Sequence, residues 1–207
     1  MAGIDGEQGA LTPLSSPAFW HDLVWSRPAA AVAFGWGLAE ATAFFIVPDV
    51  WLGLITLFDR RGGARAVAWS VAGALLGGAI MYGAGAAFSP PATARFLDAI
   101  PAISPAMIDR VEQEMRAQGL ASMLLGPLRG TPYKIYARTA GVQRQSLPAM
   151  LLWTIPARSA RFLLIAALAA AYGAAMRRCT SHPAWLLGPY FLTWIVFYWF
   201  YFRTYGS

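Results

Sequence analysis

Residues 119–161 read GLASMLLGPLRGTPYKIYARTAGVQRQSLPAMLLWTIPARSAR, and the rest of the chain is organised around them. Its flanks are as apolar as membrane segments, yet it contains the cations Arg129, Lys134, Arg138, Arg158 and Arg161, with Arg144 in a short linker. Gly126-Pro127 and Thr131-Pro132 interrupt the helical pattern. Irregular backbone in a bilayer is tolerated only where it is buried in protein or lines a wet cavity, and cations there are costly and usually functional. We therefore expect the functional site of the protein to lie in this stretch.

The composition is that of a membrane protein. The chain has 207 residues, of which 57% are hydrophobic and 13% are charged, and its mean hydropathy is +0.48. A soluble domain carries about 25% charged residues, so the sequence predicts one integral membrane domain over residues 1–207. The net charge of +6 comes almost entirely from arginine in short loops or apolar runs. This placement indicates anionic lipid, and not nucleic acid, as the partner.

Several classes of site are excluded by residue type and spacing. Cys179 is the single cysteine, which excludes an internal disulfide and a cysteine-based metal cluster. His21 and His182 are too far apart for a zinc motif, and neither a Ser-His-Asp set nor a glycine-rich phosphate loop is present. We expect no enzyme activity, no metal and no cofactor. Residues 1–15 lack a signal-peptide core, so the protein is expected to begin near Met1.

The first part of the chain combines a tail, a surface helix and a broken apolar segment. Residues 1–27 comprise a loose tail and a short interfacial helix that starts at Ser16-Pro17. Residues 29–58 are apolar but interrupted by Glu40 and by Pro48-Asp49, which favours a re-entrant hairpin with its break near Val47-Pro48. A basic, turn-prone linker is expected at 59–65, followed by a spanning helix at 66–88. Gly73-xxx-Gly77 in that helix favours close packing. Residues 28–88 are thus one hairpin-plus-helix unit.

The second part repeats this plan. A polar connector over 89–118 contains a solvated or interfacial helix that starts at Ser104-Pro105 and ends at Gly119. Residues 120–141 form two apolar arms around the break at 126–132, and a long helix follows over 147–176, so 119–176 is a second hairpin-plus-helix unit. The aromatic segment 184–203 is expected to be a C-terminal transmembrane helix that faces lipid.

The two units form an inverted repeat in this interpretation. Arg27, Arg60, Arg61 and Arg65 are placed in the cytoplasm by the positive-inside rule, and the two hairpins then enter from opposite faces. Paired interrupted segments in corresponding positions point to a transporter's substrate site.

Three motifs, in this order and spacing, resemble a known family. They are Glu40-ATAFFIV-Pro48-Asp49, Gly126-PLRGTPYKIYARTA-Gly141 and Arg158-SA-Arg161-Phe162. Over residues 28–176 the chain is similar to the DedA-like membrane proteins, also called VTT-domain or SNARE-associated proteins, and within them to the YqaA-like branch. Many members have a second arginine where this chain has Ile135.

The resemblance implies opposed re-entrant loops and a multi-pass protein of the bacterial inner membrane. It also implies lipid translocation, because some members are implicated in moving undecaprenyl phosphate and eukaryotic relatives scramble phospholipids. Other members are linked to proton-dependent membrane physiology.

Glu40, Asp49, Arg158 and Arg161 form the predicted charge cluster. Arg158 and Arg161 are three residues apart in the middle of a long helix, so both must face the bundle, where Glu40 or Asp49 would pair with them. Glu40 is also a candidate proton-coupling group, and these two roles are compatible. Asp49 alternatively caps the second arm of the hairpin.

Arg129, Pro132, Lys134 and Arg138 are the predicted substrate-binding residues. The planar guanidinium of Arg129, at the break, suits phosphate or carboxylate, although a purely structural ion pair is the alternative. Lys134 and Arg138 share one helical face and either join this site or extend to the membrane interface.

The leading hypothesis is a transporter that moves an anionic lipid, such as a lipid phosphate, between leaflets, with protons as a candidate coupling ion. The alternatives are a proton-coupled transporter of a small ion and a non-transporting membrane scaffold. A homo-oligomer is one option for the assembly.

Overall fold

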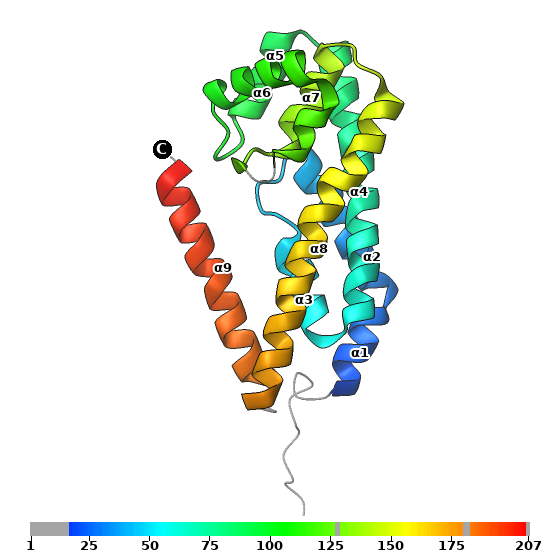
Figure 1. The fold of residues 1–207 in the computed structure, drawn as a ribbon, viewed down its shortest axis with the longest axis vertical. Coiled ribbons are helices and arrows are strands. Elements are labelled where there is room, and N and C mark those ends of the chain that lie inside the picture. The colour runs from blue at the N-terminus through cyan, green and yellow to red at the C-terminus, as the bar shows by residue number, and fades with distance from the viewer. Residues whose placement is uncertain (1–16, 127–128, 180–182, 206–207) are drawn as a thin grey trace, which may run out of the picture.

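The computed structural model describes residues 17–126, 129–179 and 183–205, and all regular secondary structure in them is helical (Figure 1). Three helices contain segments long and apolar enough to cross a membrane: α4 (Arg60–Ala87), α8 (Leu147–Cys179) and α9 (Pro183–Tyr205). The all-α fold is therefore confirmed, and the three apolar helices are compatible with a membrane protein. The tail 1–15, the cap at Ser16 and Pro127 lie outside the described residues.

The N-terminal part contains α1 (Pro17–Trp25), α2 (Arg27–Thr42) and α3 (Asp49–Phe58). The Ser26 hydroxyl caps α2 by accepting a 3.1 Å bond from the Ala29 backbone N–H, and Pro28 follows in the first turn. An irregular segment, residues 43–48, separates α2 from α3. The Trp25 indole donates to the Asp59 carboxylate over 3.2 Å, so the start of α2 and the end of α3 lie at the same end of the molecule.

Helix α4 begins at Arg60 and not at residue 66, so the expected linker at 59–65 was wrong. The Asp59 carboxylate caps α4 by accepting from the Gly62 N–H at 2.8 Å. Gly62 and Gly63, which suggested a turn, serve close packing inside the helix. A Cβ at Gly62 would lie 2.0 Å from the Val24 side chain.

Glycines let α4 pack closely against α2 with its first half and against α7 (Tyr133–Val142) with its second. A Cβ at Gly73 would lie 2.0 Å from the Phe34 carbonyl oxygen of α2. A Cβ at Gly141 of α7 would lie 2.0 Å from the Tyr82 carbonyl oxygen. The close packing predicted from Gly73-xxx-Gly77 is therefore present, and α4 is the common support of both segments.

The connector contains two helices, α5 (Pro90–Asp98) and α6 (Pro105–Gln118). Helix α6 starts as predicted, with the Ser104 hydroxyl accepting from the Met107 N–H, and it ends at Gly119, where φ is +63°. Helix α5 was not predicted, although Ser89-Pro90 carries the same serine–proline start signal as α6. One face of α6, formed by Ile108, Val111 and Met115, is buried in the core, so the connector packs onto the bundle.

The segment after α6 differs from the two apolar arms that were expected. Its first arm is a 3₁₀ helix, η2 (Gly119–Leu124), and α7 starts only after Pro132. Residues 133–141 of α7 are all buried. In Figure 1, α5, α6 and α7 gather at the end opposite α1, and α8 runs the length of the molecule between the two ends.

Helix α9 leans away from α8 toward its C-terminus (Figure 1). It is held near its start by the Tyr172 hydroxyl, which donates to the Leu186 carbonyl over 3.1 Å, and by the Tyr190 hydroxyl, which donates to the Val50 carbonyl. Its large exposed side chains include Trp185, Leu192, Ile195, Trp199 and Phe200. This face is typical of a helix in contact with lipid.

Candidate functional site

Glu40 of α2 and Arg158 of α8 form a buried ion pair in which Nη2 of the guanidinium donates to Oε2 of the carboxylate. The expected contact between Glu40 and one of the two α8 arginines is therefore present. The guanidinium carbon of Arg158 also lies 4.6 Å from the centroid of the Phe162 ring and 5.3 Å from that of Tyr133. The aromatic faces stabilise this buried cation.

Asp49 and Arg161 form a second pair one turn farther along α8. Nε and Nη2 of Arg161 both donate to Oδ2 of Asp49, at 2.9 and 2.6 Å. Asp49 is the first residue of α3, and Pro48 stands at the cap position, so the carboxylate binds an arginine and no cap bond is formed. Its other oxygen, Oδ1, is buried and has no hydrogen-bond partner among the described residues. The Arg161 side chain is 28% exposed.

Lys134 lies at the start of α7, and its side chain does not extend to a membrane interface. The residue is only 2% exposed. Its ammonium donates to the backbone carbonyl of Phe44 over 2.7 Å. Lys134 thus joins α7 to the turn between α2 and α3.

Arg138 belongs to a different cluster from Lys134, although the two lie one turn apart. It is fully buried and donates to the Thr93 hydroxyl, the Glu112 carboxylate and the Pro90 carbonyl. Arg138 therefore ties α7 to α5 and α6. Because all of its partners lie in the connector, its position favours a structural role.

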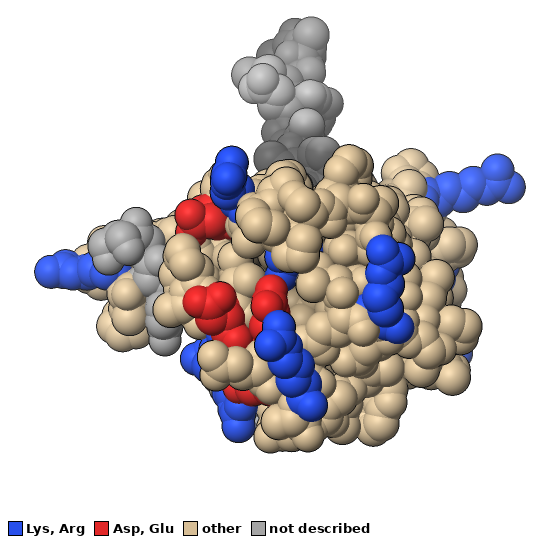
Figure 2. Space-filling model, turned by 90° about the horizontal axis from the view of Figure 1, so that it is seen from above, with Lys and Arg blue, Asp and Glu red and all other residues tan. Residues whose placement is uncertain are grey.

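Arg129 lies near the surface, where its side chain is 48% exposed and pairs with Glu114 of α6 at 2.7 Å. The end of the molecule above α5 and α6 shows acidic side chains beside basic ones (Figure 2). The predicted substrate-binding set of Arg129, Lys134 and Arg138 is thus distributed over three places. Sequence reasoning missed Glu112 and Glu114 as partners because it assigned the acids of the connector to solvent.

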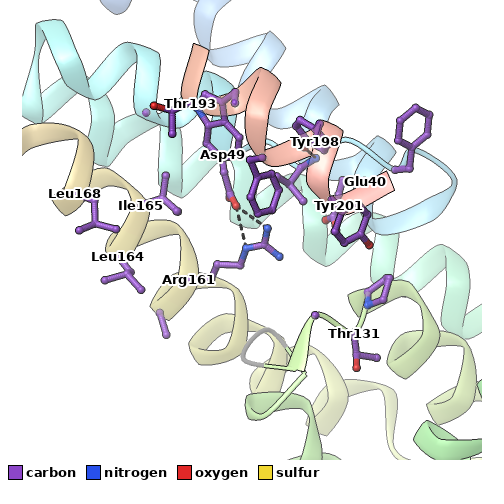
Figure 3. Close-up of a pocket in the computed structure, with 18 of the residues that line it drawn as sticks. Glu40, Asp49, Thr131, Arg161, Leu164, Ile165, Leu168, Thr193, Tyr198 and Tyr201 are labelled. Carbon is purple, nitrogen blue, oxygen red and sulfur yellow. Dashed lines mark hydrogen bonds and ion pairs between the residues drawn. The ribbon is translucent and has the colours of Figure 1, made fainter. Parts of the chain in front are cut away.

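A cavity of about 810 Å³ lies between α8, α9, α3 and the start of α7. Its charged lining consists of Glu40, Asp49, Lys134 and Arg161, and Thr131 and Pro132 lie beside them. Its walls are mostly apolar and include Leu164, Ile165 and Leu168 of α8 and Trp194, Phe197 and Tyr198 of α9. Figure 3 shows Arg161 reaching from α8 to Asp49 within this cavity. Arg129 and Arg138 are not among the described residues that line it.

The contribution of α9 to this cavity was not anticipated. The sequence assigned its aromatic residues to lipid contact alone, yet Tyr198 lines the cavity and its hydroxyl accepts from the Val47 N–H at 3.0 Å. The spacing of aromatic residues along α9 does not show which of them face the other helices. The sequence alone therefore could not identify Tyr198 as a residue that lines the cavity.

Two helices begin at the cavity wall. Asp49 is the first residue of α3 and Lys134 the second of α7, and both line the cavity. Helix N-termini present unpaired N–H groups and partial positive charge. Together with Arg161 and Lys134, they make the cavity suited to an anionic group attached to an apolar body.

Within the described residues, no group of three or more histidine, cysteine, aspartate or glutamate side chains could hold a metal ion. Comparison with protein-family models, with curated proteins and with solved structures found no significant match.

Proposed function

We propose that this protein moves an anionic lipid between membrane leaflets, with the lipid phosphate held in the cavity between α8 and α9. The observation that carries the proposal is the division of that cavity into a charged part, at Glu40, Asp49, Lys134 and Arg161, and apolar walls. A phosphate head group matches the first and acyl chains match the second. A small inorganic ion would use only the charged part, so the apolar walls favour an amphiphile.

The membrane arrangement in this proposal is an inverted repeat. The α2–α3 segment and the η2–α7 segment are two re-entrant hairpins that enter from opposite faces, and α4 and α8 are the spanning helices that follow them. Support comes from the short helices α3 and α7, which both begin at the cavity, because discontinuous helices with N-termini near the midplane are typical of substrate sites in transporters. This plan is the one that the resemblance to DedA-like proteins implies, in a bacterial inner membrane.

The arginine distribution supports an orientation for this arrangement. Arg27, Arg60, Arg61 and Arg65 lie around the start of α2 and the start of α4, and Arg177 and Arg178 lie in the last turn of α8. We place this end in the cytoplasm.

Arg161 is the proposed primary ligand of the phosphate. Its side chain is partly exposed, and Nε and Nη2 bind Asp49, which leaves Nη1 for a ligand in the cavity. Lys134 of α7 supplies a second positive charge in the lining of the cavity. The wall position of Arg161 favours it over Arg129, whose guanidinium pairs with Glu114 outside the cavity.

Proton coupling, where it occurs, is assigned to the pair of Glu40 and Arg158. Protonation of Glu40 would remove the charge that holds Arg158. The released guanidinium would then favour a rearranged bundle, which biases access to one side.

The test is a reconstitution assay with lipids labelled on the acyl chain, so that the head group is unchanged. Liposomes that contain the wild-type protein should expose inner-leaflet lipid phosphate to a membrane-impermeant quencher faster than protein-free liposomes do. Arg161→Lys keeps the charge and loses the planar guanidinium, so its rate should fall by about tenfold or more. Arg129→Lys is the matched control and should transport normally. No acceleration by the wild type, or full activity of Arg161→Lys at equal protein level, would refute the proposal.

A further inference from the structure

The charges around the cavity set the charge of the ligand that fits it. Among the lining residues, the carboxylates of Glu40 and Asp49 balance the cations of Lys134 and Arg161. Arg158, which does not line the cavity, is bonded to Glu40 behind its wall and adds one positive charge. The site as a whole thus has one positive charge in excess. In a low-dielectric site an uncompensated charge is costly, so a ligand with one negative charge is the best match.

Asp49 sets a second requirement on the ligand, which is a hydrogen-bond donor. Its Oδ2 receives both bonds from Arg161, whereas its buried Oδ1 has no hydrogen-bond partner among the described residues. A buried acceptor without a donor is destabilising, and more so when it is charged. Asp49 lines the cavity, so a rotation of its carboxylate would turn Oδ1 toward a ligand there, and a hydroxyl group of that ligand can then supply this donor.

From these two observations we infer that the cavity selects a phosphodiester head group with one net negative charge and a free hydroxyl, as in a phosphoglycerol lipid, and that Asp49 sets this preference. The inference rests on the proposed function. Nη1 of Arg161 binds a phosphate oxygen while the ligand hydroxyl donates to Oδ1 of Asp49. Both contacts come from one ion pair, so the phosphate and the hydroxyl are recognised at a fixed separation.

Two other head groups fit less well for separate reasons. A phosphomonoester such as phosphatidic acid carries about 1.5–2 negative charges near neutral pH, by analogy with phosphorylated side chains, which exceeds the single positive charge of the site. A phosphocholine head group has no net charge and no hydrogen-bond donor, so it leaves Oδ1 of Asp49 without a partner.

The experiment compares phosphatidylglycerol, phosphatidylcholine and phosphatidic acid with identical acyl-chain labels in the same liposomes. The wild type should move phosphatidylglycerol faster than the other two by about tenfold, because this lipid donates a hydrogen bond to the charged Asp49 and carries the matching charge. Asp49→Asn removes a negative charge from the site, so phosphatidic acid should become the preferred lipid. Glu114→Gln removes an acid from the Arg129 pair outside the cavity and should leave the ranking unchanged.

A binding measurement covers the case in which Asp49→Asn fails to fold. Short-chain forms of the three lipids, added to wild-type protein in detergent, should raise its melting temperature in the same order, with phosphatidylglycerol first. Equal rates and equal thermal shifts for the three lipids, or an unchanged ranking in folded Asp49→Asn, would overturn the inference and leave the proposed function standing. Absence of any lipid movement by the wild type would overturn both.

Discussion

Lys134 of α7 donates a 2.7 Å hydrogen bond to the backbone carbonyl of Phe44, which lies 90 residues earlier in the chain. Phe44 follows the end of α2, in the irregular segment before α3. Its carbonyl lies just beyond the C-terminus of α2, where a cation is a favourable ligand. One buried side chain therefore links the α2–α3 turn to the start of α7, directly at the cavity that both of them line.

Replacing Lys134 by methionine should destabilise the protein by about 1–3 kcal/mol. The methionine side chain fills similar space but donates no hydrogen bond, so the Phe44 carbonyl is left without its partner. The measurement is the fraction of protein that stays monodisperse in detergent after heating. Lys134→Arg keeps a hydrogen-bond donor and should lose less stability than the methionine variant. A methionine variant as stable as the wild type would show that the bond contributes nothing.

Truncation of Arg158 should be among the most damaging single changes. Arg158→Ala leaves the Glu40 carboxylate buried and unpaired, which costs about 3–5 kcal/mol. Glu40→Gln keeps an acceptor for the guanidinium, so it should destabilise less while abolishing transport. Arg129→Ala breaks an exposed pair and serves as the control, with an expected loss of about 0–1 kcal/mol. Similar thermal stability of the Arg158 and Arg129 variants would contradict the importance of the buried pair.

A methyl group at Gly73 should weaken the contact between α4 and α2. Its Cβ would lie 2.0 Å from the Phe34 carbonyl oxygen, and the helices would have to separate, at a cost of about 1–3 kcal/mol. Gly83 lies in the same helix, and a Cβ added there would point into open space. Gly83→Ala should therefore leave stability unchanged or raise it by about 0.5–1 kcal/mol. Melting temperatures of the two variants in the same detergent test this difference.

Asp59 should make the cap of α4 sensitive to pH. The Gly62 N–H bond to its carboxylate, more than any other contact, holds the pKa of Asp59 below its usual value of 3.8. Because the folded-state pKa is the lower one, the stabilisation is complete above the unfolded-state value and is lost as pH falls through the folded-state pKa. Asp59 is partly exposed, so the effect is at most about 1 kcal/mol.

Asp59→Asn provides the control for this pH dependence. An asparagine can still cap α4, but it does not titrate. Thermal stability should fall between about pH 5 and pH 3 more steeply in the wild type than in the variant. Parallel stability curves for the two proteins would show that Asp59 does not contribute to the acid sensitivity.

Labelling of single cysteines should place both ends of the α2–α3 segment on one side of the membrane. In a Cys179→Ser background, Arg27→Cys and Arg65→Cys should react with an impermeant maleimide from the same side. Gln118→Cys and Arg144→Cys, which flank the η2–α7 segment, should react from the other side. Labelling of residues 27 and 65 from opposite sides would show that the α2–α3 segment spans the bilayer.

Part of the site could be predicted from the sequence because a charged side chain in an apolar segment needs a partner of opposite charge. Glu40, Asp49, Arg158 and Arg161 lie within segments too apolar to leave them solvated, and two acids with two arginines must then pair. Pro48 and Pro132 likewise predict short helices, because each proline removes a backbone donor and stands beside further charged or helix-breaking residues. The isolated Pro156 leaves α8 continuous. These inferences depend on residue type and local spacing alone. Helix α5 could also have been predicted, because Ser89-Pro90 repeats the serine–proline pattern that predicted the start of α6.

The packing of the helices, and not the local sequence, sets which acid each arginine binds and which residues share the cavity. Arg129 and Arg138 bind Glu114 and Glu112 of the connector, and Tyr198 of α9 lines the cavity. These contacts depend on how helices far apart in the sequence are rotated and placed around α4. Many acids could neutralise a given arginine equally well, and only the packing of close-fitting helices brings one of them within hydrogen-bond distance.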